Sequence, residues 1–488
     1  MGAIKKSHLA GLALLLAGAF AFGQIATWPS RLRYPGEEDL AEGPRLAEMI
    51  HLRQGARIYD PPSPSGFDAS IHGPLYLLFG SRLVNPEKPA YLPLRVFSLL
   101  ATLGCAAGCA LLAFRLSQSY FAAMLAPLIF LSYRIVTFHG LSARCDAVGL
   151  GISFTGFLVA YRYRSSRMLL LATPLLLLGF FYKQQFIAVP LALFLSLLLE
   201  KRYRLAAELV GLSVAGGLAF LALFRFVAFR GQAFLTHFLL YNALPIAPNR
   251  LVSGALFWGA LFFFPLLVGL EYLRLHRDKL LACYLGCTLI ISIVSFGREG
   301  SDTNYFLESA LLLSALFAAL LAERIAALAR AAELLALLTL SLLLAQLFAL
   351  RPPRDQDFVQ DHNIQVFLRR RFTPHTRAFG YYNGDLLRAG LETPISDIYE
   401  YSWLIRRKIV SDDLILAQLQ ERRFGVVVLS FDLQGKSDGY WPNYYLTGGV
   451  RQAILANYQP AANLPMPEPE KFSPTDRFYV WTPKSTPP

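Results

Sequence analysis

The densest group of carboxylates in this 488-residue chain lies in one stretch, EEDLAEGPRLAEMIHLRQG, at residues 37–55. Its acids are Glu37, Glu38, Asp39, Glu42 and Glu48. Pro44 is typical of the first turn of a helix and Gly55 of its end, which predicts a short helix with Glu42 just ahead of it. The positive end of a helix keeps a carboxylate ionised, and an ionised carboxylate at a membrane surface can act as a general base. Glu42 is therefore a candidate base; a solvated acidic loop that only caps the helix is the alternative.

Other ionisable residues recur at positions that the apolar pattern assigns to one side of a membrane. They are His72, Arg134, His139, Arg144, Asp146, Lys183, Arg298, Glu299 and Glu308. Charge at a membrane is costly and needs either a partner or a function. Structural pairing, such as that of Arg144 with Asp146, is one interpretation, and Arg298 with Glu308 is a second such pair. An excess of cations beside a carboxylate cluster favours instead a site for an anionic ligand embedded in the membrane.

Two further segments offer hydrogen-bonding groups to such a ligand. IHGPLYLLFGSRLV, residues 71–84, is typical of a second short helix, and His72 with the first backbone N–H groups would form an anion site at its N-terminus. His72 as a simple cap is the alternative. In GREGSDTNYFLES, residues 297–309, Asn304 and Tyr305 offer hydrogen bonds where a later apolar segment begins.

The composition indicates where these groups are carried. Hydrophobic residues make up 55% of the chain and charged residues only 16%, whereas soluble domains carry roughly 25% charged residues. Apolar runs near 20 residues match the thickness of a bilayer core. About eleven transmembrane helices are predicted, at 8–28, 92–114, 119–138, 147–161, 168–182, 184–199, 206–229, 251–272, 280–296, 304–322 and 331–350.

Lysine and arginine in the short loops predict the orientation, because such residues stay on the cytoplasmic side. Basic residues cluster near 5–6, 162–167, 201–204, 274–279 and 324–330. The N-terminus is therefore expected in the cytoplasm, and residues 29–91 and the chain after 350 outside it. The first span is long enough for a retained helix, with a cleaved signal peptide as the alternative.

The apolar run 168–199 lies between two basic loops and must cross an even number of times. Two spans of about 15 residues reach only about 22 Å, less than a hydrocarbon core of roughly 30 Å. Lys183, at the junction, is therefore expected below the outer surface in a dip or groove.

The sequence divides into a membrane domain, residues 1–350, and a C-terminal domain, residues 351–488. In the second part SDDLILAQLQERR, residues 411–423, has helix start and stop signals. FGVVVLSF at 424–431 and RFYVW at 477–481 are typical of buried strands. The fold class is mainly α, a polytopic membrane protein with a C-terminal α/β extracytoplasmic domain.

Several of these motifs, in this order, resemble those of the GT-C membrane glycosyltransferases. The chain is similar to the bacterial family-39 protein mannosyltransferase and lipid A aminoarabinose transferase group. EGPRLAE (42–48) stands where that group often has Asp-Glu-Pro-Arg-Tyr-Ala-Glu, and HGPLY (72–76) resembles its Lys/His-Pro-Pro-Leu-Tyr element. ARCDAVGLGI (143–152) and GFFYKQQFIAVP (179–190) resemble two later elements, so the likeness covers mainly residues 1–210.

The resemblance implies an inverting glycosyltransferase that moves a hexosyl or pentosyl group from a polyprenyl-phosphate donor to a hydroxyl group. Carried over by motif, Glu42 is the base, His72 and Lys183 contact the lipid phosphate, and Arg144 is a further contact. Glu42 replaces the usual aspartate and Gly43 the acid that follows, so Glu38 or Asp39 becomes the base if the alignment shifts by one turn. The remaining candidate binding residues are Asp146, Arg298, Asn304, Tyr305 and Glu308.

No cofactor other than the lipid-linked sugar donor is implied. A divalent cation is possible, but the spacing of the Cys, His and acidic residues gives it no support. The partners expected are the polyprenyl-phosphate-linked sugar, membrane lipids, and a glycan, lipid or protein acceptor at the outer face of a bacterial inner membrane. The basic residues fall where topology explains them, so no nucleic acid is expected.

Two other classes of function compete with this one. A lipid or glycan transporter or flippase would have inverted repeats and helices broken at mid-membrane, and neither is evident. A non-catalytic GT-C-like scaffold would tolerate the loss of Glu42 and Lys183 alike.

Overall fold

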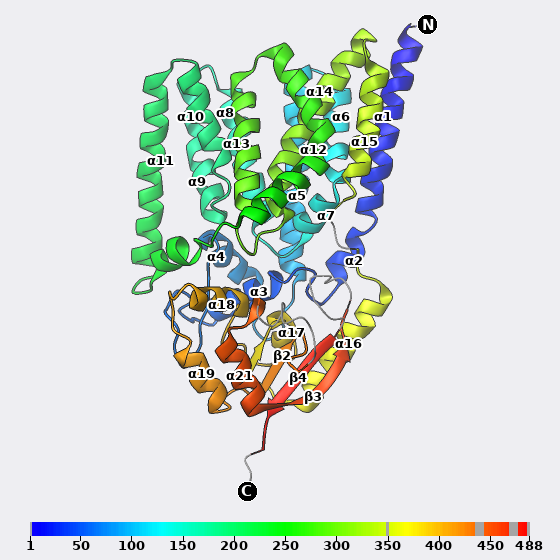
Figure 1. Cartoon of the computed structure of the whole chain (residues 1–488). Helices are drawn as coiled ribbons and strands as arrows, with labels where there is room; N and C mark the ends of the chain where they lie inside the picture. The colour runs from blue at the N-terminus through cyan, green and yellow to red at the C-terminus, as the bar shows by residue number, and fades with distance from the viewer. Residues whose placement is uncertain (1, 348–350, 435–443, 468–476, 486–488) are drawn as a thin grey trace.

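The computed structural model describes residues 2–347, 351–434, 444–467 and 477–485. A bundle of helices forms one half, and a smaller α/β half lies against one end of the bundle (Figure 1). Residues 348–350, next to the expected domain division, lie outside the described residues.

Six helices among the described residues are long and apolar enough to cross a membrane, and a bent pair makes a seventh candidate. The six contain α1 (Gly2–Ile25), α5 (Leu92–Ser117), α11 (Tyr203–Leu223), α12 (Pro248–His276), α13 (Lys279–Phe296) and α14 (Leu307–Ala327). Shorter helices of the bundle are α8 (Asp146–Arg162), α9 (Thr173–Tyr182), α10 (Ala188–Leu199) and α15 (Ala331–Leu344). The chain is a multi-pass membrane protein in which several of the predicted spans are short or bent helices.

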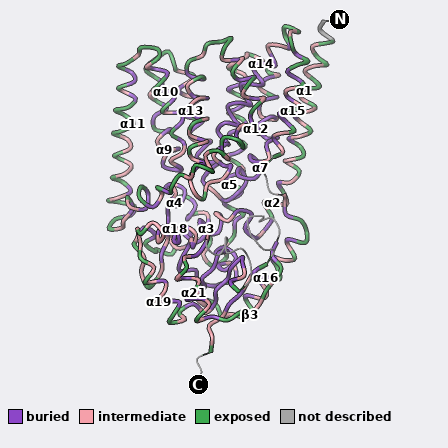
Figure 2. Tube along the Cα trace, in the orientation of Figure 1, coloured by how far each residue is buried: buried purple, intermediate pink, exposed green. Residues whose placement is uncertain are grey.

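The helix α14 forms the centre of the bundle, because every residue from Leu307 to Ala322 is buried. Its serines and alanines let neighbouring helices approach closely, as small residues do at helix contacts in membranes. The peripheral α11 is largely exposed along its length, as the tube view shows (Figure 2), which suits a helix that faces lipid.

Two breaks in the bundle supply polar residues to the end that faces the α/β half. The predicted span 119–138 is wrong as a single helix: α6 (Tyr120–Ser132) and α7 (Arg134–Leu141) meet at a 75° bend at the extended residue Tyr133. The run 168–199 does break at Lys183, where α9 ends and the backbone becomes extended.

Short helices cover the end of the bundle that faces the α/β half: α2 (Trp28–Arg33), α3 (Glu42–Arg53) and α4 (Pro74–Leu83). At the start of α4, a Cβ atom on Gly73 would lie 2.1 Å from the carbonyl oxygen of Phe181. Only glycine fits this close approach, which packs the start of α4 against the end of α9.

The α/β half contains α16 (Asp355–Arg371), α17 (Asn383–Arg388), α18 (Ile398–Arg406), α19 (Asp413–Gln420) and α21 (Gly448–Asn457). Its strands are β1 (Ala378–Gly380), β2 (Val426–Leu429), β3 (Tyr458–Pro465) and β4 (Arg477–Pro483). They form one sheet in the order β1-β2-β4-β3, with β1 and β2 parallel and the other pairs antiparallel. All of β2 is buried, as its run of valines predicted.

Candidate active site

Glu42 is bound on all sides by protein groups. Helix α3 begins at Glu42, not after it, and the side chain is fully buried. Arg95 of α5 donates from Nε to Oε1 at 3.0 Å and from Nη2 to Oε2 at 2.6 Å. The backbone N–H of Ala143 donates to Oε1 at 2.6 Å, and that of Glu38 to Oε2 at 2.9 Å. Glu42 thus ties α3 to α5 and to the loop before α8, and it does not line the cavity described below.

Each neighbouring acid is bound by a partner of its own. Glu37 Oε1 accepts from the backbone N–H of Gly384 at 2.9 Å, which joins the acidic loop to α17. Glu38 is ion-paired with Arg31 of α2. Glu48 is ion-paired with Arg45, one turn earlier in α3, at 2.7 Å. These acids therefore hold the acidic loop and α3 in place through both local and distant contacts.

Asp39 differs from the other acids of the stretch because it lines a cavity. Arg144 donates to its Oδ2, and the backbone N–H of Ala41 donates to its Oδ1 at 2.8 Å. Burial alone would raise the pKa of Asp39, but the charges of Arg144 and His139 outweigh it and lower this pKa below its ordinary value. Asp39 is consequently an ionised carboxylate at neutral pH.

A chain of ion pairs links Asp39 to Lys183. Arg144, paired with Asp39, also donates from Nε to Asp146 Oδ2 at 3.0 Å. Asp146 accepts from Lys183 Nζ through its other oxygen at 2.5 Å. Asn304 Nδ2 donates to that same oxygen at 2.7 Å. The residues of three predicted motifs are thereby held in one polar network.

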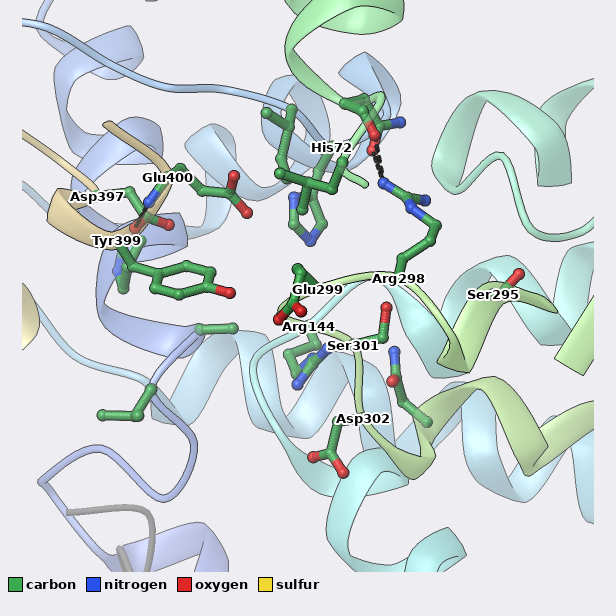
Figure 3. A pocket seen from close by; sticks show the side chains of 18 of the residues that line it. His72, Arg144, Ser295, Arg298, Glu299, Ser301, Asp302, Asp397, Tyr399 and Glu400 are labelled. Carbon is green, nitrogen blue, oxygen red and sulfur yellow. Dashed lines mark hydrogen bonds between the residues drawn. The ribbon is translucent and has the colours of Figure 1, made fainter. Parts of the chain in front are cut away.

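The cavity has a volume of about 510 Å³ and lies between the helix bundle and the α/β half. Figure 3 shows Arg298 and Arg144 on one side of it, with Tyr399 and Glu400 projecting from α18 on the other. The ring of Tyr305 lies 4.5 Å from Lys183 Nζ, a cation–π contact that holds the ammonium group at the cavity wall.

The membrane side of the cavity is electropositive. Burial lowers the pKa of His72 well below its ordinary value, and the charges of Arg45, Lys183 and Arg144 lower it further. His72 is therefore neutral, and its Nδ1 has no hydrogen-bond partner among the described residues. The cations Arg45, Lys183 and Arg144 around this neutral imidazole make the site suited to an anion.

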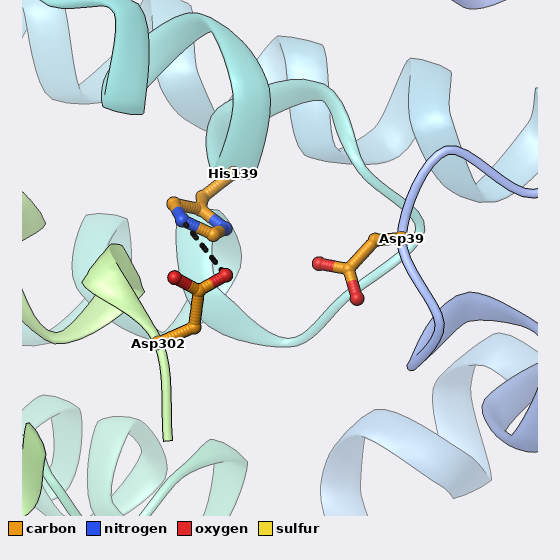
Figure 4. Close-up of side chains that lie close together, drawn as sticks. All are labelled: Asp39, His139 and Asp302. Carbon is orange, nitrogen blue, oxygen red and sulfur yellow. Dashed lines mark ion pairs between the residues drawn. The ribbon is translucent and has the colours of Figure 1, made fainter. Parts of the chain in front are cut away.

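Three residues at the cavity edge could hold a metal ion. Asp39, His139 and Asp302 each offer one ligand atom, and these atoms all lie within 4.8 Å of one another (Figure 4). His139 Nε2 lies 3.8 Å from Asp302 Oδ2 and 3.0 Å from Thr303 Oγ1. Two carboxylates and an imidazole suit a divalent ion such as Zn²⁺ or Mn²⁺. The sequence spacing gave no sign of this cluster, because the three residues come from three separate loops or helices.

Most, but not all, of the residues predicted from the sequence meet at the cavity. Those that line it are Asp39, His72, Arg144, Lys183, Arg298, Asn304 and Tyr305. Asp146 lies one contact behind it, joined to Lys183 and Arg144. Glu42, Glu38 and Glu308 do not line it. Glu308 instead accepts a hydrogen bond from Tyr284 at 2.7 Å in the bundle, so the expected pair with Arg298, which donates to Asn242 Oδ1 at 2.8 Å, is not formed.

The sequence did not identify several other residues that line the cavity. Asp302, Arg45 and Arg250 line it from the membrane half, and Tyr381, Asp397, Tyr399, Glu400, Tyr444 and Tyr445 from the α/β half. No spacing or motif marks these residues as a group. The only signal is the density of tyrosine and acid in SDIYEYSW, residues 396–403.

A second cavity, of about 480 Å³, lies between α9 and α11. Its lining is almost entirely apolar and includes Leu170, Leu177, Leu212, Ala219 and Phe220. Because α9 ends at Tyr182, this cavity lies on the helix that leads directly to Lys183.

No family model matches the sequence, and no curated protein matches it. The structure, however, is similar to crystal structures of ArnT from Cupriavidus metallidurans. For the form bound to undecaprenyl phosphate, the TM-score is 0.57 at 13% sequence identity, over 96% of this chain and 98% of that one. For the apo form, the TM-score is 0.56 at 13% identity, over 95% and 97% of the two chains. The chain therefore has the fold of the GT-C membrane glycosyltransferases.

Proposed function

We propose that the protein is an inverting glycosyltransferase that moves a sugar from a polyprenyl-phosphate donor to an acceptor hydroxyl group. The observation that carries this proposal is the network in which Asp39 and Lys183 face one cavity and are joined through Arg144 and Asp146. It combines an ionised carboxylate that lines the cavity, Asp39, with several cations in a GT-C fold.

Asp39, and not Glu42, is the base in this proposal. A general base must come within hydrogen-bond reach of the proton that it takes. Asp39 lines the cavity, and each of its oxygens accepts one hydrogen bond, from Arg144 or from the backbone N–H of Ala41. Glu42 does not line it, and each of its oxygens accepts two hydrogen bonds, from Arg95 and from a backbone N–H group. Asp39 accepts the proton of the acceptor hydroxyl while the hydroxyl oxygen forms a bond to the anomeric carbon.

The bond from that carbon to the phosphate oxygen breaks at the same time, and its electron pair stays on the phosphate. Lys183, Arg144 and Arg298 stabilise the charge that develops there, which is electrostatic catalysis. His72 is neutral and can donate a hydrogen bond to the same phosphate. The products are a glycosylated acceptor with inverted configuration and the polyprenyl phosphate.

The apolar cavity between α9 and α11 is the proposed site of the lipid tail. It is lined by leucine, alanine and phenylalanine and lies on the helix that ends at Lys183. The undecaprenyl phosphate bound by the structurally similar ArnT supports a lipid phosphate of this kind as the ligand.

A divalent cation, if bound, would be held by Asp39, His139 and Asp302. It would supply further positive charge beside the phosphate. The steps above are carried by the protein's own side chains, and none of them depends on this ion.

The proposed location is a bacterial inner membrane, with the N-terminus in the cytoplasm and the cavity and α/β half outside. The excess of lysine and arginine in the opposite loops supports this orientation. An outer location suits a lipid-linked donor, because nucleotide sugars are confined to the cytoplasm.

The proposal is tested by mass spectrometry of lipid-linked sugars and envelope glycans. Cells without the protein, and cells with Asp39→Asn, should accumulate one polyprenyl-phosphate sugar and lack one glycan modification that the wild type restores. Unchanged glycans in both strains would contradict a transferase. A donor redistributed between leaflets, with the total transferred sugar unaffected by Asp39→Asn, would instead indicate a flippase.

A further inference from the structure

The cavity has two chemically different walls, and the proposed transfer uses only one of them. The wall from the membrane half carries Lys183, Arg144 and His72. The wall from the α/β half is formed by the start of α18 and by nearby tyrosines, with Asp397, Tyr399 and Glu400 in succession. Figure 3 shows the ring of Tyr399 and the carboxyl group of Glu400 projecting into the space opposite the cations.

Contacts to both halves of the protein hold this second wall in place. Asp397 caps α18 by accepting from the backbone N–H of Glu400 at 3.0 Å. Asp397 Oδ2 also accepts from Arg45 Nη2 of α3 at 3.1 Å. The hydroxyl groups of Tyr399 and Tyr444 lie 3.0 Å apart. A Cβ atom on Gly300 would lie 2.9 Å from the Tyr399 ring, so the loop before α14 is closely packed against it.

Glu400 has an unmet hydrogen-bonding requirement. Only 7% of the residue is exposed, and its Oε2 has no hydrogen-bond partner among the described residues. A buried oxygen without a partner costs about 1–3 kcal/mol, which a hydroxyl group of a ligand would offset. Burial and the charge of Asp397 raise the pKa of Glu400 to about 8, so at neutral pH it is mostly a carboxylic acid that can both donate and accept.

The aromatic side chains of this wall, together with its carboxyl and phenol groups, form a surface to which a sugar with many hydroxyl groups can bind. A lipid chain would leave these polar groups unpaired, whereas a sugar satisfies them and covers the aromatic surface. The apolar cavity for a lipid lies elsewhere, between α9 and α11. The second wall therefore differs in chemistry from both parts of the proposed donor site.

We infer that the start of α18 is the acceptor subsite and that the acceptor is a carbohydrate, whose ring lies against Tyr399 and whose hydroxyl groups bond to Glu400. The inference rests on the proposed function, because Asp39 must reach one acceptor hydroxyl. It deepens that function by selecting a glycan over a peptide or a simple lipid. It also assigns the α/β half a direct part in substrate selection.

The test uses the full-length protein in lipid nanodiscs and an array of bacterial oligosaccharides, with a Ser/Thr-rich peptide as the alternative acceptor. The wild type should bind at least one oligosaccharide, and Tyr399→Ala and Glu400→Ala should each weaken that binding about tenfold. Affinity for polyprenyl phosphate should stay unchanged in both variants, which also shows that they are folded. Glu392→Ala, an exposed acid of the same half, should bind the oligosaccharide as the wild type does.

Oligosaccharide binding that neither substitution weakens would overturn the inference. Binding of the peptide alone, weakened by Tyr399→Ala, would overturn the choice of carbohydrate. A wild type that binds the oligosaccharide through Tyr399 but does not bind polyprenyl phosphate would leave the subsite standing and contradict the proposed transferase instead.

Discussion

Arg95 and Glu42 form a two-point ion pair in which Nε donates to Oε1 at 3.0 Å and Nη2 to Oε2 at 2.6 Å. Both side chains are essentially inaccessible. The acid that motif comparison selects as the catalytic base is therefore a structural link between α3 and α5.

Glu42→Gln should for this reason destabilise the protein. Loss of one partner leaves the guanidinium of Arg95 buried without its counter-charge, at a cost of about 3–5 kcal/mol. Thermal unfolding in detergent measures this cost. Glu421→Gln, which removes an exposed pair with Arg423, is the matched control and should cost less than about 1 kcal/mol. A Glu42→Gln protein as stable as the wild type but unable to transfer sugar would restore Glu42 as the base.

Asp39→Asn, unlike Glu42→Gln, should lower turnover and leave the fold intact. The amide cannot accept the acceptor proton, so turnover should fall by about a hundredfold or more. The cavity keeps its shape, so affinity for polyprenyl phosphate should be retained or increased as one negative charge is lost. Turnover with a purified donor and titration with polyprenyl phosphate separate the two effects. Turnover close to that of the wild type would exclude Asp39 as the base.

Lys183→Met should weaken the binding of polyprenyl phosphate. The ammonium group lies at the cavity wall, and a charge-assisted hydrogen bond to phosphate should contribute about ten- to a hundredfold in affinity. Asp146 keeps Arg144 and Asn304 as partners, so the fold should persist. Lys201→Met, at an exposed position in an opposite loop, should bind as the wild type does. Equal affinities for the two variants would place the phosphate elsewhere.

The stability of the protein should fall as the pH rises from about 5 to 8. Burial raises the pKa of Glu48 to about 8, although Arg45 opposes this shift. In this window the folded protein keeps a proton that the unfolded chain has lost, so raising the pH favours unfolding, by about 1.4 kcal/mol per pH unit for a fully shifted group.

Glu48→Gln should reduce that slope, because the amide does not titrate. Melting temperatures measured at intervals between pH 5 and 9 give the comparison. Glu400, whose pKa is also about 8, should leave part of the slope in the variant. The same pH dependence of stability in the wild type and in Glu48→Gln would show that Glu48 is ionised in the folded protein.

Local pattern predicted much of the architecture. The break at Lys183 followed from the length of one apolar run between two basic loops. The buried strand β2 followed from its valines, α3 from Pro44 and Gly55, and α4 from the pattern of residues 71–84. These features depend on residues close together in sequence, and propensity and hydrophobic spacing act at that range.

The bend at Tyr133 was not predicted, although Arg134 directly follows it, because the segment 119–138 taken as a whole has the length and hydropathy of one span. The part of the cavity wall that the start of α18 forms was not predicted for a related reason. Tyr399 and Glu400 belong to a segment typical of a soluble α/β fold, and only its packing against α3 and the loop before α14 turns them toward the cavity.

The sequence by itself determined that the chain crosses a membrane, that a carboxylate cluster and several cations lie on one side of it, and that an α/β domain follows. Only the tertiary structure decided which carboxylate faces the cavity. The acids at 37, 38, 39, 42 and 48 are chemically alike, and their partners at 384, 31, 144, 95 and 45 come mostly from distant parts of the chain. A buried carboxyl group needs hydrogen-bond donors or a counter-charge, and the packing of the folded chain supplies these to the other four away from the cavity and leaves only Asp39 of the five at its wall.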